Sequence, residues 1–137
     1  MNRYLKQRLT IVIFISLVLI LSGCSGVVTP NISDFTICEN LLKGLYAALS
    51  SQNFALALSY CKTGGLTFDY VNDLWGLSQQ YPGYTAIYQV YDVYDFSYMV
   101  GGGVYLCYDY SWTTTTTYYM YGRIMNFVKV NGEWKMV

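Results

Sequence analysis

The side-chain pattern of this chain changes at Tyr81-Pro82-Gly83, and the change restricts the fold to one class. Before it, apolar residues recur every three or four positions, which is the spacing of one helix face. After it, β-branched and aromatic residues dominate, which favours strands. Helices followed by antiparallel strands in one short chain form an α+β domain, and 137 residues leave room for one such domain.

The first part of the pattern predicts three helical segments. The first begins at Ser33 or Asp34, either of which can cap it, and ends at the polar residues 50–53. Asn53 is the expected cap of the second helix, and Thr67 is the expected cap of the third.

The second part predicts four strands, at about residues 84–99, 104–113, 117–130 and 133–137. Asn131-Gly132 joins the last two, and this dipeptide between two apolar runs is a strong signal of a two-residue hairpin turn. Such a turn places Trp134 opposite Lys129, whereas a bulged turn would shift the register by one residue.

The start of the chain is typical of an exported protein. Residues 1–8 carry three positive charges, and residues 9–22 form an uncharged apolar run. This run is shorter than the ~20 apolar residues that a membrane-spanning helix needs. It ends at Leu21-Ser22-Gly23-Cys24, which resembles the lipobox of bacterial lipoproteins. The alternative is an ordinary signal peptide that contains a cysteine.

The lipobox resemblance implies cleavage before Cys24 and a diacylglyceryl group on its thiol. Stable anchoring takes about two acyl chains, so we expect the membrane to be a partner through this lipid anchor. The expected organisation is a lipoprotein signal peptide at 1–23, a lipidated tether at 24–32 and a folded domain at 33–137. The anchor would hold that domain on the cell membrane or the outer membrane, facing the periplasm or the exterior.

The folded part resembles nuclear transport factor 2-like domains, a group that includes SnoaL-like and cystatin-like proteins. Residues 41–49 and 53–60 are similar to the two helices that open these domains, and residues 131–136 are similar to the hairpin that closes them. The resemblance implies N-terminal helices packed on a strongly bent antiparallel sheet of about four strands, which forms a cone with room for a pocket. Relatives include isomerases, dehydratases, non-catalytic binding modules and dimers.

The composition excludes several function classes. The chain has no histidine, which removes the commonest general base and the commonest metal ligand. Beyond residues 1–23, five cations face eight carboxylates, so no basic patch is available and we expect no nucleic-acid partner. The cysteine spacings fit no zinc motif. We therefore expect no metal site and no cofactor.

The isomerase relatives imply an alternative function, a small pocket enzyme of isomerase or dehydratase type that uses an Asp and a Tyr. The candidates are Asp92, Asp95 and Asp109, which fall among tyrosines in predicted strands. None of them lies in a motif that assigns such a role. Asp92 and Asp95 also have opposite parity on one strand, so they would point to opposite faces. We expect no catalytic residue and no enzyme activity.

Two cysteines are candidates for a disulfide. Cys38 and Cys61 fall on two predicted helices at similar distances from the turn at residues 50–52, and an oxidising compartment permits the bond. The alternative is that both are small buried apolar residues. Cys107 is expected to be an unpaired thiol in the core.

Tyrosine is the most unusual part of the composition, because twelve of its sixteen occurrences lie between Tyr81 and Tyr121. A tyrosine presents a stiff apolar ring with a polar tip, which suits a half-wet binding surface. Strict alternation along residues 84–99 puts four aromatic candidates on one face, namely Tyr88, Tyr94, Phe96 and Tyr98. The alternative is that these rings only stabilise the sheet through cross-strand pairs.

The sequence therefore predicts a lipid-anchored, extracytoplasmic binding or structural module without catalysis. The aromatic face would bind an envelope protein, a glycan or a second copy in a homodimer. The ligand itself is not identified by any motif.

Overall fold

The computed structural model describes residues 33–137, which belong to one compact unit. Three helices come first in the chain, and four strands follow them: α2 (Asp34–Ser50), α3 (Phe54–Ser59), α4 (Leu66–Gln80), β1 (Ile87–Tyr98), β2 (Val104–Thr113), β3 (Thr117–Val130) and β4 (Glu133–Met136). The strands form one antiparallel sheet in the order β1-β2-β3-β4. The predicted α+β class, with helices packed on an antiparallel sheet of four strands, is confirmed.

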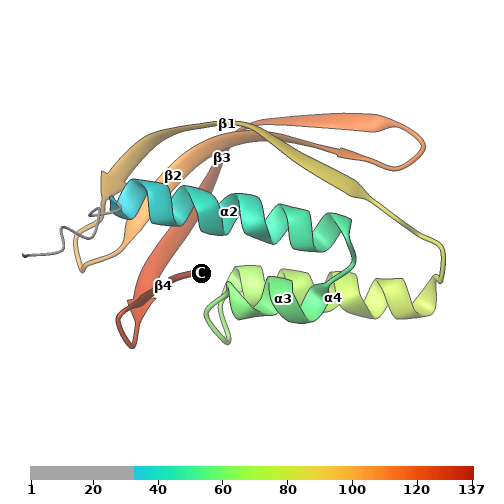
Figure 1. The fold of residues 1–137 in the computed structure, drawn as a ribbon, viewed down its shortest axis with the longest axis horizontal. Coiled ribbons are helices and arrows are strands. Elements are labelled where there is room, and N and C mark those ends of the chain that lie inside the picture. Colours follow the sequence, from blue (N-terminus) through green and yellow to red (C-terminus); the bar gives the residue numbers. More distant parts are fainter. Residues whose placement is uncertain (1–32) are drawn as a thin grey trace, which may run out of the picture. The chain divides into compact units, whose positions relative to one another are not determined.

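The sheet curves over α2, and α3 and α4 lie on the far side of α2 from β1 (Figure 1). The core fills the space between α2 and the inner face of the sheet, and its largest fully buried side chains include Leu42, Leu45, Leu106 and Phe127. Because residues 33–137 belong to a compact unit with a core of its own, that part of the chain can be expected to fold without the residues before it. Within the same residues, no helix is both long enough and apolar enough to cross a membrane.

Two of the three predicted helix caps are confirmed. Ser33 Oγ accepts the Thr36 N–H at 3.2 Å, and Asn53 Oδ1 accepts the Leu56 N–H at 3.1 Å. The predicted cap of α4 is wrong, because Gly65 occupies that position. The Thr67 hydroxyl instead donates to the Val137 carbonyl at 2.7 Å, so a tertiary contact with the end of the chain takes the group that could have capped the helix.

The predicted two-residue hairpin is also confirmed. Asn131 and Gly132 have φ angles of 52° and 84°, and positive φ at both central residues is what a type I′ turn requires. Lys129 pairs with Trp134, as this turn predicts, and the Lys129 ammonium lies 4.8 Å from the centre of the Trp134 ring. Asp34 Oδ1 accepts the Trp134 indole N–H at 2.9 Å, which ties the start of α2 to β4.

The sheet contains irregularities that the sequence pattern does not show. In β1 the register against β2 shifts between Val90 and Asp92 and again between Tyr94 and Ser97. In β3 an extra residue stands near Gly122, whose φ is 60°. Bulges of this kind increase twist and bend a strand, which matches the curvature of the sheet over α2 (Figure 1).

Candidate functional site: a tyrosine-lined cleft

A cleft of about 380 Å³ opens between α4 and the β2–β3 part of the sheet, beside the middle of α2. It exists because α4 packs mainly against α3 and makes few contacts with the sheet, one of them between Thr67 and Met125. Its volume lies within the ~300–1,000 Å³ typical of small-molecule sites. The lining comprises Leu45, Tyr46, Leu66, Thr67, Tyr70, Tyr108, Tyr110, Arg123, Ile124, Met125, Asn126 and Val137.

A second hollow of about 450 Å³ lies between α2 and the β3–β4 turn. Its charged groups already have partners, because Lys135 Nζ is 3.2 Å from Glu133 Oε2 and donates to the Ser59 carbonyl at 2.9 Å. The tyrosine-lined cleft differs in having a charged group without such a partner, and it is the better candidate for a binding site.

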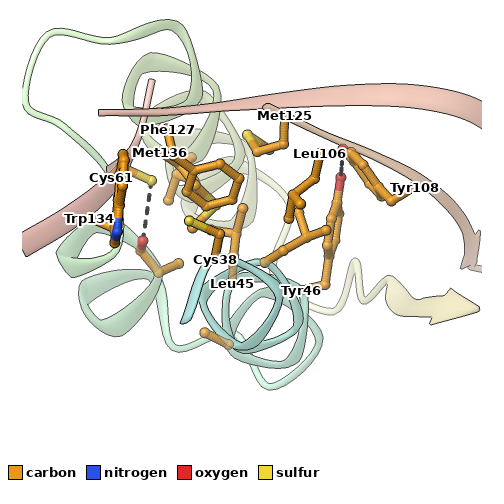
Figure 2. Close-up of a cluster of buried hydrophobic side chains, with 14 of the residues drawn as sticks. Cys38, Leu45, Tyr46, Cys61, Leu106, Tyr108, Met125, Phe127, Trp134 and Met136 are labelled. Atoms are coloured by element: carbon orange, nitrogen blue, oxygen red, sulfur yellow. Dashed lines mark hydrogen bonds between the residues drawn. The ribbon is translucent and has the colours of Figure 1, made fainter. Parts of the chain in front are cut away.

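Three tyrosines form the base of the cleft. Tyr46 reaches from α2 to the sheet, where its hydroxyl oxygen lies 2.7 Å from that of Tyr108 (Figure 2). The Tyr46 ring also stacks on Tyr110 with 4.9 Å between ring centres. Tyr108 and Tyr110 share the inner face of β2 because side chains alternate along a strand. The three rings are therefore held in place by one another.

Burial favours the neutral form of three tyrosines of the cleft. It is the largest cause that raises the pKa of Tyr46, of Tyr70 and of Tyr108 above the ordinary value of 10.0. At neutral pH these groups are phenols that donate and accept hydrogen bonds, and they do not supply a phenolate base.

Arg123 is the one charged side chain in the lining of the cleft. It pairs with Tyr108 across β2 and β3, so both side chains leave the same face of the sheet. Within residues 33–137, its guanidinium makes no salt bridge and no hydrogen bond. Five N–H donors of a cation that is charged at any ordinary pH are therefore available at this site.

The three carboxylates considered for catalysis lie outside this lining. Asp109 does form the expected pair with a tyrosine, because Tyr94 donates its hydroxyl to Oδ1 at 3.0 Å. The same oxygen accepts the Gly122 N–H at 2.8 Å, so Asp109 stabilises the bulge of β3 from the outer face of the sheet, the face away from α2. Asp92 and Asp95 are both exposed, and Asp95 has a φ of 51° next to the second bulge of β1.

The expectation that four aromatic side chains of β1 share one face is wrong. The first bulge adds a residue after Val90 and thereby resets the alternation. Val93 pairs with Tyr108 and packs against the core, so its neighbour Tyr94 points to the outer face.

Of the other three candidates from β1, Phe96 and Tyr98 contact each other, with 5.2 Å between ring centres, and Tyr88 packs elsewhere. Tyr88 packs against Tyr46 in the core, with 5.6 Å between ring centres. Phe96 contacts Phe35 at the same separation of 5.6 Å. Tyr98 is 68% exposed and donates its hydroxyl to Asp34 at 3.2 Å. The four residues consequently form no common surface.

A different group of tyrosines gathers on the outer face of the sheet. Tyr119 stacks between Tyr91 and Tyr121, with ring centres 6.1 Å and 6.4 Å apart. All three are at least half exposed. This row joins β1 to β3 and is the main exposed aromatic surface of the sheet.

The predicted lipidation site, Cys24, lies outside the described residues. Cys38 and Cys61, named here the core thiols, are free and buried in the structure, and Cys61 Sγ donates to the Ala57 carbonyl at 3.4 Å (Figure 2). Burial raises the pKa of Cys38 to about 12 and that of Cys61 to about 11. Their pairing in an oxidising compartment stays a prediction. Cys107 is a free, half-buried thiol.

Sequence reasoning missed the residues that build the cleft. Alternation along residues 104–113 could have placed Tyr108 and Tyr110 on one face, since that strand has no bulge of its own before Tyr108. A lone arginine in an aromatic strand was a second signal. Nothing in the local pattern shows that α4 leaves this face open. Among the described residues, no group of acidic, cysteine or histidine side chains is arranged to hold a metal ion.

Comparison with known proteins supports the fold and leaves the function open. No protein-family model and no curated protein matches the chain. It is similar to Bd1075 from Bdellovibrio bacteriovorus, with a TM-score of 0.55 and 8% identity over 72% of this chain, but it spans only 36% of that protein. It is also similar to Aln2 from a Streptomyces species, with a TM-score of 0.55 and 10% identity over 79% of this chain and 87% of that one.

A third solved structure is described as an NTF2-like protein of unknown function from Cytophaga hutchinsonii. The match has a TM-score of 0.40 and 17% identity, and it covers 72% of this chain and 87% of that one. Identities this low indicate at most a shared fold.

Proposed function

We propose that this chain is a lipid-anchored module outside the cytoplasmic membrane that binds a small ligand in the tyrosine-lined cleft without transforming it. The composition of the cleft carries the proposal. Tyr46, Tyr70, Tyr108 and Arg123 are protonated at neutral pH, and the lining includes no acidic side chain. Such a site can hold and orient a ligand but offers no side chain that would accept a proton, as an isomerase or dehydratase requires.

The proposed location is supported by the basic, apolar start of the chain and by the lipobox resemblance at residues 21–24. Membrane fractionation and intact mass of the full chain, beside a Cys24→Ala variant, test it. The wild type should lose residues 1–23, gain a diacylglyceryl group and stay with the membrane. If the variant has the same processing and fractionates in the same way, the lipid anchor is refuted.

The proposed binding site is tested with a neutral aromatic probe. Residues 33–137 are titrated with N-phenyl-1-naphthylamine, whose fluorescence rises in apolar surroundings. Tyr70 is 45% exposed at the rim of the cleft, and we expect Tyr70→Ala to weaken saturable binding by about tenfold.

Tyr119→Ala is the matched control, because Tyr119 is 56% exposed on the outer face, away from the cleft. It should leave the titration unchanged. The reverse result would move the binding site to the outer face, and a wild type without saturable binding would refute a binding role for the cleft.

A second candidate function is self-association through the outer face, which the exposed row of Tyr91, Tyr119 and Tyr121 favours. Sedimentation velocity of residues 33–137 over a range of concentrations tests it. A dimer that is lost in Tyr119→Arg supports a homodimer, and a monomer at all concentrations leaves this face to an envelope partner.

A further inference from the structure

We infer that the cleft takes an amphipathic organic anion, a carboxylate attached to a flat ring system. The acid group would pair with Arg123, and the rings would lie against the tyrosines. This inference rests on the proposed function, since it requires that the cleft is a binding site. It adds the charge and the shape of the ligand, which the proposed function does not specify.

The charge follows from the state of Arg123. Three of the described cations already have carboxylate partners, namely Lys43 with Glu39 at 2.7 Å, Lys129 with Asp34 at 3.9 Å and Lys135 with Glu133 at 3.2 Å. Arg123 and Lys62 have none within residues 33–137, and of these two exposed cations only Arg123 lines the cleft. Its planar fork fits a carboxylate through two parallel N–H···O bonds.

The surrounding charge makes this cation distinctive. Residues 33–137 contain eight carboxylates and five cations, so an unpaired cation in a cleft is not the consequence of a basic surface. The acidic remainder of the domain would also disfavour loosely held anions by long-range repulsion. Only an anion that contacts Arg123 directly would overcome it.

A cationic ligand fits the cleft less well. Several tyrosine rings around one space can bind a quaternary ammonium group by cation–π attraction. Here the same space is lined by Arg123, which would repel a second positive charge, and the lining contains no acidic side chain to offset it. The rings are therefore better explained as apolar walls.

The arrangement of those walls favours a flat ligand. The Tyr46 and Tyr108 rings each lie 27° from the plane of Tyr110, at centre separations of 4.9 Å and 5.7 Å. Because Tyr46 and Tyr108 are only 6% and 4% exposed, the accessible aromatic surface is the half-buried Tyr110 ring that they hold in place, and offset stacking on such a ring is favourable for another ring. In the Tyr46–Tyr108 hydroxyl pair, one hydroxyl hydrogen is not used by the 2.7 Å bond and can be donated to a polar substituent.

The test uses two probes of the same shape that differ in charge, 1-naphthoate and its neutral analogue 1-naphthamide. Both are titrated calorimetrically into residues 33–137 of the wild type, of Arg123→Gln and of Lys43→Gln. Lys43 is an exposed cation on α2 outside the cleft, so its variant has the same change in net charge. We expect the wild type to bind 1-naphthoate more tightly than 1-naphthamide. Arg123→Gln should weaken 1-naphthoate roughly 10- to 100-fold and change 1-naphthamide by less than about twofold.

The outcomes distinguish a failure of the anion assignment from a failure of the cleft as a binding site. Retained 1-naphthamide binding shows that Arg123→Gln is folded with an intact cleft, so a selective loss of 1-naphthoate supports the inference. Equal binding of both probes, or an equal loss of 1-naphthoate in Lys43→Gln, overturns the anion assignment and leaves the cleft as a binding site. If N-phenyl-1-naphthylamine binds but neither naphthalene probe does, the inference is also overturned. If none of the three binds, the proposed function fails as well.

Discussion

The hydroxyl pair of Tyr46 and Tyr108 is predicted to be strongly coupled. The two oxygens lie 2.7 Å apart, and the two residues are 6% and 4% exposed. Tyr46→Phe or Tyr108→Phe removes one hydroxyl, keeps the stacked ring and leaves the other hydroxyl buried without its partner. Such an orphaned group costs about 1–3 kcal/mol of unfolding free energy.

The double variant should be no less stable than the worse of the two single variants. Replacing both partners by apolar groups of the same shape is nearly neutral, because no buried polar group is then left unsatisfied. The coupling free energy of the cycle is therefore at least the cost of one single variant, about 1–3 kcal/mol, and equals the sum of both single costs if the double variant is neutral. With an m-value of ~1–3 kcal/mol/M in urea, each single variant should shift the unfolding midpoint by about 1 M.

Equilibrium urea unfolding of residues 33–137, followed by far-ultraviolet circular dichroism, measures this cycle. Equal m-values for the four proteins are the control that the unfolded reference is unchanged. If the costs of the two single variants simply add in the double variant, the hydroxyls are solvated independently and the base of the cleft is not built as described.

Further predictions concern an acid group, a turn and the core thiols. The hydrogen bond from Trp134 is the largest cause that lowers the pKa of Asp34 below 3.8, so the ionised Asp34 stabilises the fold at neutral pH and this stabilisation is lost as the pH falls through the folded-state pKa. The urea midpoint of Asp34→Asn should therefore fall less steeply with acid than that of the wild type. Gly132→Ala should cost about 1–2 kcal/mol in the same assay because φ is 84°, whereas Gly76→Ala, in a helix with open space around it, should stabilise by roughly 0.5–1 kcal/mol; the opposite signs would refute the turn geometry. In the reduced domain the core thiols should react with iodoacetamide only after unfolding, and if export pairs them, mass spectrometry of the non-reduced mature protein should find two fewer alkylated cysteines than in the reduced form.

Much of the fold was predictable because its causes are local. The caps at Ser33 and Asn53 are side chains that bond to backbone groups three residues away. The hairpin at Asn131-Gly132 depends on two residues that accept positive φ, and its geometry then sets the register of Trp134. Even the limits of β2 and β3 match the sequence expectation, since alternation and strand-forming side chains continue along both segments.

The faces of β1 show where local reasoning stops. Strict alternation assigns Tyr88 and Tyr94 to one face, but the bulge after Val90 reverses the side chains that follow it as far as the second bulge, so Tyr94 lies on the outer face. A one-residue insertion leaves almost no trace in composition, because its cause is the curvature that the sheet needs in order to close over α2.

What the sequence by itself determined about this protein is the α+β class, the helix caps, the hairpin register and the expectation of export and lipidation at Cys24. Only the tertiary structure decided which tyrosines contact one another, that Asp109 stabilises the β3 bulge from the outer face of the sheet, and that Arg123 lies beside Tyr108 without a carboxylate partner among the described residues. The physical reason is the distance along the chain between the residues that make each contact. Caps and turns are satisfied within a few residues, whereas the cleft exists because α4 packs mainly on α3 and meets the sheet through few residues, such as Thr67 against Met125. These contacts join residues far apart in the chain.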